Sequence, residues 1–279
     1  DPLNAVNPEF IPNSFNLASA GETNLDIYYY LKNMLDSGVK INYIIFQIDL
    51  HTFSLQPGKM KKIAPVFYCK FIPYDELKKW YDSSKLSYWT CYYNLFLGGG
   101  GDILTRIISP KTMHMSDKGW VPFIPPESDF SKLNSEEKEF ILSTRHRGHF
   151  EDSLEIDVNS LEYTYFKKSL ELAKEKNLSI ILIEYPVTKE YENYAAEKNI
   201  SKEKYYKDLS RLINSTIGNK YYLLDYSQYF HNHSEYFADP NHLNAKGAEA
   251  FSKKVYEDFM KLGLETGNYE SIKKNPEVS

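Results

Sequence analysis

The sequence has few cysteines and no long apolar run. Its two cysteines, Cys69 and Cys91, are too few and too far apart for a zinc site, and whether they pair stays open. No stretch approaches the roughly 18 apolar residues that cross a bilayer, and the first residues do not resemble a signal peptide. We therefore expect no membrane span within the chain. Because it opens on Asp1 and not on Met, we keep open an anchor or signal upstream.

An excess of positive charge is also lacking, since 33 basic residues stand against 38 acidic ones. The net charge is -5 and the sequence pI is about 5.9, whereas a protein that binds nucleic acid needs a basic face. The glycine run at 98–101 lacks the Gly-Lys-Ser/Thr ending of a phosphate-binding loop. We predict no nucleic-acid partner, no cofactor and no bound metal.

The remaining composition is that of a folded globular protein. Apolar residues make up 42% and charged residues 25%, and 279 residues are enough for one sizeable core. Aromatic residues reach 15%, with 24 tyrosines. Tyrosine and tryptophan suit carbohydrate surfaces because their rings stack on sugars while their polar tips stay hydrated. The codon bias of an AT-rich genome would explain the same enrichment, so this observation leaves both explanations open.

Apolar runs and helical patterns alternate along most of the chain. Strands are predicted at 15–18, 43–48, 180–185 and 221–225, and helices at 25–35, 160–176, 188–197, 201–216 and 244–262. The run at 43–48 is apolar almost throughout, which is typical of a strand covered on both faces. Strands separated by helices favour a parallel sheet with right-handed crossovers. The pattern predicts an α/β fold with three layers, α/β/α.

A long segment interrupts this alternation. Residues from about 55 to 155 are rich in proline, include the glycine run, and show helical patterns only near 75–83 and 86–108. We interpret this segment as a large insertion over the sheet. The chain is then one domain over 1–262, followed by a C-terminal tail over 263–279.

The strongest chemical signal is an aspartate three residues before a histidine. Asp239 and His242 lie in a predicted loop that leads into the last helix. A carboxylate at this spacing can hold one imidazole nitrogen and leave the other to act as a base. Loop pairs of this kind also serve only to cap helices, and Asn244 is itself a good N-cap candidate.

The surroundings of this pair resemble a known family. Residues 239–248 read Asp-Pro-Asn-His-Leu-Asn-Ala-Lys-Gly-Ala, similar to the last block of SGNH/GDSL hydrolases, Asp-x-x-His-Leu-x-x-x-Gly. Residues 15–23 read Phe-Asn-Leu-Ala-Ser-Ala-Gly-Glu-Thr, similar to the family's second block. The resemblance implies a flavodoxin-like fold, Asp239 and His242 as orienting acid and base, and the Gly21 amide in an oxyanion hole.

Two departures concern the nucleophile and the oxyanion hole. The family's serine turn normally precedes the second block by more than the fifteen residues found here before Asn16. We therefore expect the nucleophile upstream of residue 1, with Ser19 as the alternative within the chain. The family's Gly-x-Asn-Asp block should follow the strand at 43–48, but this position reads Asp-Leu-His-Thr. By resemblance, His51 lies nearest to the missing asparagine and would donate to the oxyanion in its place.

Other polar candidates carry weaker signals. Trp120 in the insertion would line a substrate cleft or anchor the insertion to the core. The cationic stretch at 145–149 places Arg145 and Arg147 where they would contact an acidic glycan or form a solvated loop. His231 and His233 have a spacing that suits metals, but no carboxylate or cysteine motif accompanies them.

These observations and the resemblance lead to one expectation and two alternatives. We expect a serine-dependent esterase or O-acetyltransferase that acts on a polysaccharide or another acylated molecule of the bacterial cell envelope, outside the cytoplasm. The alternatives are a binding module for a glycan or partner protein that lacks catalysis, and a subunit of an envelope acylation complex that works with a membrane acyl-donor protein. The acyl group, the acceptor and the oligomeric state stay open.

Overall fold

A computed structural model describes residues 5–18, 22–49, 52–53, 72–80, 116–121, 128–150, 156–197 and 202–264, with the backbone alone for 145–150. Its strands are β1 (Tyr43–Gln47), β2 (Ser179–Glu184), β3 (Tyr221–Asp225), β4 (Phe237–Asp239) and β5 (His242–Leu243). Its α-helices are α2 (Asn24–Asp36), α4 (Tyr74–Trp80), α7 (Ser135–Phe150), α8 (Leu161–Glu175), α9 (Lys189–Glu197), α10 (Lys202–Ile217) and α11 (Ala245–Lys261). Short 3-10 helices are η1 (Pro8–Phe10), η3 (Phe130–Lys132) and η4 (Ser234–Tyr236).

The sheet is parallel, as the alternating pattern predicts. Strands β1, β2 and β3 lie side by side in that order, with Ile45 opposite Ile181 and Ile181 opposite Tyr222. The connections between them contain the helices α8 and α10, which is the arrangement that parallel pairing requires. The prediction of an α/β fold with a parallel sheet is confirmed.

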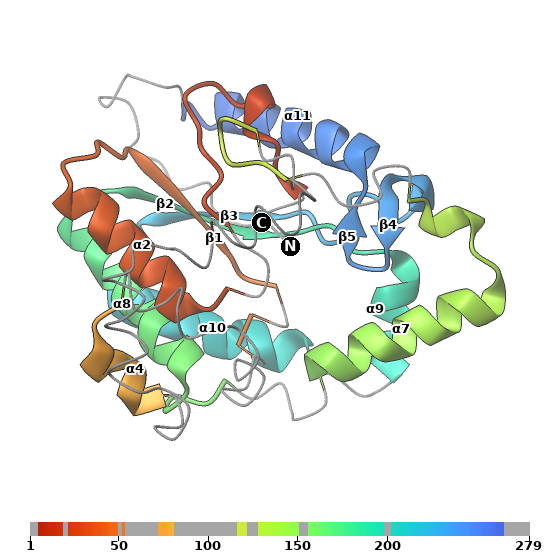
Figure 1. Ribbon diagram of the computed structural model, residues 1–279, viewed down its shortest axis with the longest axis horizontal. Helices are drawn as coiled ribbons and strands as arrows, with labels where there is room; N and C mark the ends of the chain where they lie inside the picture. The colour runs from red at the N-terminus through yellow and green to blue at the C-terminus, as the bar shows by residue number, and fades with distance from the viewer. Residues whose placement is uncertain are drawn as a thin grey trace, which may run out of the picture.

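Helices cover both faces of this sheet. Alternate residues of β2 point to opposite sides, so Ile180 and Leu182 belong to one core cluster and Ile181 and Ile183 to another. The first cluster contains apolar side chains from α2, α8 and α10, and the second contains those of α11. Figure 1 shows α11 on one side of the sheet and the other three helices opposite it. All residues of β2 after Ser179 are buried, which explains its continuous apolar sequence.

Helix ends follow local capping rules. Thr23 and Asp26 form a capping box at the start of α2, and the Ser160 side chain accepts from the Tyr163 amide at the start of α8. Asn244 caps α11 through the Gly247 amide, as predicted. These caps are local, so the predicted helix starts lie within a residue or two of the observed ones.

The expected strand at 15–18 is wrong. The segment has no ladder partner among the described residues, and its Phe15 and Leu17 side chains are exposed. The Asn16 amide donates instead to the Lys118 carbonyl at 2.8 Å, and the Asn16 side chain donates to the Val6 carbonyl at 2.9 Å. Among the described residues, the segment is therefore held by single hydrogen bonds to the turn at 116–121 and to Val6, and not by a strand ladder.

Within the segment that the sequence analysis interprets as an insertion, 55–155, the described residues form helices and this turn. The helix expected near 75–83 is α4, and the one expected near 86–108 lies outside the described residues. The stretch at 145–149 belongs to α7, so its interpretation as a loop is wrong. None of the described helices is both long enough and apolar enough to cross a membrane.

Candidate active site

Asp239 and His242 face each other in a short hairpin. Strands β4 and β5 pair antiparallel, with Asp239 opposite His242 and only two residues between them. The Asn241 and His242 amides both donate to Asp239 Oδ1, at 3.1 and 3.0 Å. The turn therefore orients the carboxylate with its own backbone.

The imidazole completes this arrangement. His242 Nδ1 lies 2.8 Å from Asp239 Oδ1 and 2.9 Å from Oδ2. The side chains are largely buried, with 12% of His242 and 8% of Asp239 exposed. A carboxylate on Nδ1 selects the tautomer that carries its proton there, so Nε2 becomes the basic nitrogen. This is the pairing that the sequence predicts for the two residues.

The residues after the pair hold the hairpin against α11. Leu243 is buried in the core, and the Asn244 side-chain amide donates to the Glu235 and Ser128 carbonyls. Position 247 requires glycine, because a Cβ there would lie 2.1 Å from the Tyr236 carbonyl oxygen. The leucine, asparagine and glycine that follow His242 thus each have a packing role.

The hairpin lies beyond the carboxyl ends of the strands, where ligands bind in open parallel sheets. Figure 1 shows β4 and β5 past the ends of β2 and β3. One backbone bond ties the hairpin turn to the segment after β2: the Thr188 amide donates to the Pro240 carbonyl at 2.9 Å. The neighbouring Val187 amide donates to the Ser227 carbonyl, just after β3, at 3.1 Å. The pair is therefore fixed relative to the end of β2.

Buried carboxyls also gather at these strand ends. Asp49 follows β1, accepts from the Tyr185 amide at 2.7 Å and from the Gln47 side chain, and has its pKa raised by burial. Burial raises the pKa of Glu184, at the end of β2, to about 8, and the nearby Tyr206 hydroxyl opposes this shift. Both carboxyls line a small cleft with Tyr191 and Lys202. Glu184 is not among the predicted site residues, although a glutamate at the end of an apolar strand is a usable signal in the sequence.

The described part of the predicted oxyanion region is held on both sides. Asn16 is bonded to the turn at 116–121, and Asn24 is bonded to Glu162 of α8. Gly21, Ser19 and His51 lie outside the described residues, so their predicted roles stay predictions. The start of α2, just after Gly21, is described in full.

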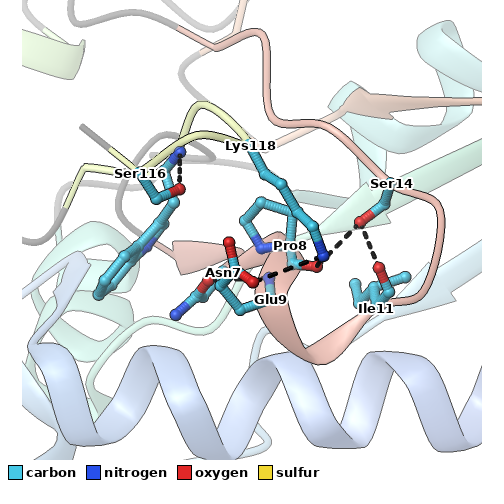
Figure 2. Close-up of polar contacts among 8 residues, drawn as sticks. Asn7, Pro8, Glu9, Ile11, Ser14, Ser116 and Lys118 are labelled. Atoms are coloured by element: carbon cyan, nitrogen blue, oxygen red, sulfur yellow. Dashed lines mark hydrogen bonds and ion pairs between the residues drawn. The ribbon is translucent and has the colours of Figure 1, made fainter.

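The segment before Asn16 and the turn at 116–121 contact each other closely. Figure 2 shows Lys118 reaching the Pro8 carbonyl and the Glu9 carboxylate, each at 3.5 Å. Gly119 has a φ of +85°, and a Cβ there would lie 2.0 Å from the Asn16 carbonyl oxygen. The next residue, Trp120, is half-buried, and its amide donates to the Ser116 hydroxyl. Whether Trp120 contacts a substrate stays a prediction.

The remaining candidates are not brought together. Arg145 and Arg147 lie in α7, and their side chains are outside the description. His231 Nε2 lies 3.3 Å from Glu192 Oε2, whereas His233 Nδ1 contacts Glu235 Oε1 at 3.0 Å. The two histidines thus face different carboxylates, and the described residues contain no cluster of three metal-ligating side chains.

Comparison with known proteins adds one partial match. A model of an uncharacterised family matches residues 151–263, the part of the chain from just before α8 to the end of α11. The match includes the hairpin with Asp239 and His242 but less than half of the 279 residues. A search of curated proteins found no match. Neither result tests the resemblance to SGNH/GDSL hydrolases.

Proposed function

We propose that this protein is a serine-dependent ester hydrolase or acyltransferase with a flavodoxin-like SGNH fold. The observation that carries the proposal is the buried contact of His242 Nδ1 with the Asp239 carboxylate, which is itself oriented by two backbone amides. This geometry makes Nε2 a base beyond the carboxyl ends of a parallel sheet. A pair that only capped a helix would not need it, because Asn244 caps α11.

The proposed chemistry proceeds through an acyl-enzyme. His242 Nε2 takes the proton of a serine hydroxyl as the serine oxygen attacks the ester carbonyl. The same nitrogen returns a proton to the leaving alcohol, and Asp239 stabilises the imidazolium formed in between. The Gly21 amide and the His51 side chain donate to the oxyanion. The proposed nucleophile is a serine upstream of residue 1, with Ser19 as the alternative.

The proposed substrate is an acyl group, in particular acetyl, on an envelope polysaccharide or another glycan. Its support is the resemblance of the two sequence blocks, together with an aromatic content that suits sugar stacking. Water as the acceptor gives hydrolysis and a sugar hydroxyl gives transfer, because both attack the same acyl-enzyme. For transfer, a membrane acyl-donor protein is the proposed partner.

Fluorophosphonate labelling followed by intact-mass measurement tests the proposal. We would compare this chain with a longer one that carries the residues encoded before Asp1. Labelling of either, lost in His242→Ala, is the expected result, because an alkoxide forms only with the base in place. His233→Ala is the matched control, since His233 is half-exposed and pairs with Glu235 instead. A lack of labelling in both chains would contradict the proposal.

One observation favours a second candidate, a binding module without catalysis. Where the family has Gly-x-Asn-Asp, residues 49–52 read Asp-Leu-His-Thr, so the asparagine that donates to the oxyanion is missing and His51 stands nearest to its place. A site without that donor could hold an ester and give its transition state less stabilisation. Binding of an acetylated oligosaccharide without turnover, unchanged in His242→Ala, would favour this candidate.

A further inference from the structure

A buried glutamate on α8 contacts the first residue of α2. Only 1% of Glu162 is exposed, and its Oε2 accepts the Asn24 amide at 2.8 Å. The Glu162 carbonyl accepts the Asn24 side-chain amide at 3.1 Å. These two bonds join residues that are 138 positions apart in the sequence.

The contact is more than a helix cap. The Thr23 side chain already caps α2 together with Asp26, and Glu162 adds an acceptor for the next amide of the same turn. A glutamate is costly to bury, since burial raises its pKa to about 8. Among the described residues, Glu162 Oε1 has no hydrogen-bond partner. An apolar residue at this position would allow α2 to pack on α8 without the free-energy cost of desolvating a carboxyl group.

The contact of Glu162 with Asn24 lies close in the sequence to the proposed oxyanion residue. Gly21, the proposed oxyanion residue, stands three positions before Asn24 in the sequence. Upstream of Gly21, the Asn16 amide is bonded to the Lys118 carbonyl. The intervening chain must run from Asn16 to Asn24, and both ends are held by residues more than 100 positions away.

We infer that Glu162 is a positioning residue, which fixes the start of α2 at Asn24, three residues after Gly21 in the sequence. The inference rests on the proposed function for the role of Gly21, but the anchoring of Asn24 stands without it. Glu162 touches no reacting atom. Its effect on the proposed oxyanion donor, the Gly21 amide, would pass along the chain that joins Gly21 to Asn24.

The pKa of Glu162 determines which substitution is the matched one. With a pKa near 8 the carboxyl is mostly protonated at neutral pH, so Gln resembles it in charge, shape and acceptor oxygen. Its neighbours Asp26 and Glu22 both favour this neutral form. Glu162→Gln should therefore keep the anchor, and Glu162→Ala should remove it. Glu171→Ala, at an exposed glutamate of the same helix, is the control.

Hydrogen–deuterium exchange and ester kinetics test the inference together, both on the longer chain that carries the residues encoded before Asp1. In Glu162→Ala we expect exchange of the amides of residues 24 and 25 to accelerate about tenfold or more. With p-nitrophenyl acetate, kcat should fall roughly 100-fold with little change in KM, because a displaced oxyanion donor affects the transition state alone. Glu162→Gln and Glu171→Ala should leave both measurements near those of the wild type.

The two readouts separate the outcomes. Unchanged exchange in Glu162→Ala overturns the inference, as does unchanged kcat in a protein that is active. Faster exchange in a protein that never turns over an ester supports the anchor and contradicts the proposed function. If Glu162→Ala does not fold, Asn24→Ala removes only the 3.1 Å bond and should show a smaller change of the same kind. No change there overturns the inference.

Discussion

The two halves of the proposed site are held in opposite ways. In the β4–β5 hairpin, Asp239 and His242 are three residues apart, and the turn between them orients the carboxylate with its own amides. At the start of α2, Asn24 is held by Glu162, which lies 138 residues further along the chain. The acid and base therefore depend on local geometry, whereas the proposed oxyanion region depends on distant parts of the fold.

This difference separates chemistry from positioning. Substitutions of Asp239 and His242 should change turnover and leave the rest of the molecule nearly intact, because the hydrogen bonds within this pair are short-range. Substitutions around Asn16 and Asn24 should change stability and backbone dynamics first, and turnover as a result. The following predictions test this contrast, from the largest expected effect to the smallest.

Asp239→Asn should have the largest effect, a loss of roughly 10⁴-fold in kcat/KM for an ester, because an amide no longer selects the right tautomer of His242. The asparagine oxygen can still accept from the Asn241 and His242 amides, so the melting temperature should change little. Steady-state kinetics and thermal unfolding measure the two effects. Glu235→Gln, on the exposed His233, is the control. Full activity in Asp239→Asn would show that the pair of Asp239 and His242 has a structural role and no catalytic one.

Gly119→Ala should have the largest effect on stability. A methyl group there would collide with the Asn16 carbonyl oxygen in a backbone with positive φ, and we expect a loss of about 3 kcal/mol in the free energy of unfolding. Gly38→Ala is the matched control, because Gly38 has a φ of +79° but nothing within 4 Å of the new Cβ. It should lose only about 1 kcal/mol. Urea denaturation of both variants measures the difference, and equal losses would show that the contact with Asn16 is unimportant.

The stability of the protein should fall as the pH rises from about 4.5 to about 8. Burial raises the pKa of Glu184 from 4.5 to about 8, so the folded state holds a proton that the unfolded state has lost in this range. Asp49 and Asp225 reinforce the shift, while Tyr206 and Lys202 oppose it. The loss from this group is about 2 to 4 kcal/mol at most.

Glu184→Gln removes this contribution, and melting temperatures at pH 5 and pH 8 measure it. The difference between the two pH values should shrink in Glu184→Gln relative to the wild type. Glu162 and Asp26 keep a residual slope, since burial raises their pKa values to about 8 and about 6. Glu203→Gln, at an exposed residue, should leave the difference as it is. If the difference in melting temperature between pH 5 and pH 8 is the same in Glu184→Gln as in the wild type, a group other than Glu184 takes up the proton on folding.

Lys118→Ala should have the smallest effect, no more than about 0.5 kcal/mol. Its ammonium contacts Glu9 at 3.5 Å, and both side chains are more than one-third exposed, so solvent screens the pair. The Asn16 amide donates to the backbone carbonyl of residue 118, and this bond remains when the lysine side chain is removed. A loss comparable to that of Gly119→Ala would mean that the side chain, and not the backbone, holds the turn in place.

The framework of the fold was predictable because its signals are local. The strands at 43–48, 180–185 and 221–225 correspond to β1, β2 and β3, and the helix at 244–262 corresponds to α11. A continuous apolar run indicates a strand buried on both faces, and apolar residues at helical spacing indicate a helix buried on one face. Both patterns can be recognised without knowing the rest of the fold. The expected strand at 15–18 is the counterexample, because its apolar residues face solvent and its backbone partner comes from the insertion.

The sequence alone determined the pairing of Asp239 with His242, because a three-residue separation inside a tight turn leaves the carboxylate few other partners. Only the tertiary structure decided that Glu162 is buried against Asn24 and that Glu184 holds its proton near neutral pH. On a helix such as α8, an exposed glutamate and a buried one look the same in the sequence. Which glutamate is buried depends on the helix that packs against it, here α2, and the contacting residue of α2 is more than 100 residues away in the chain.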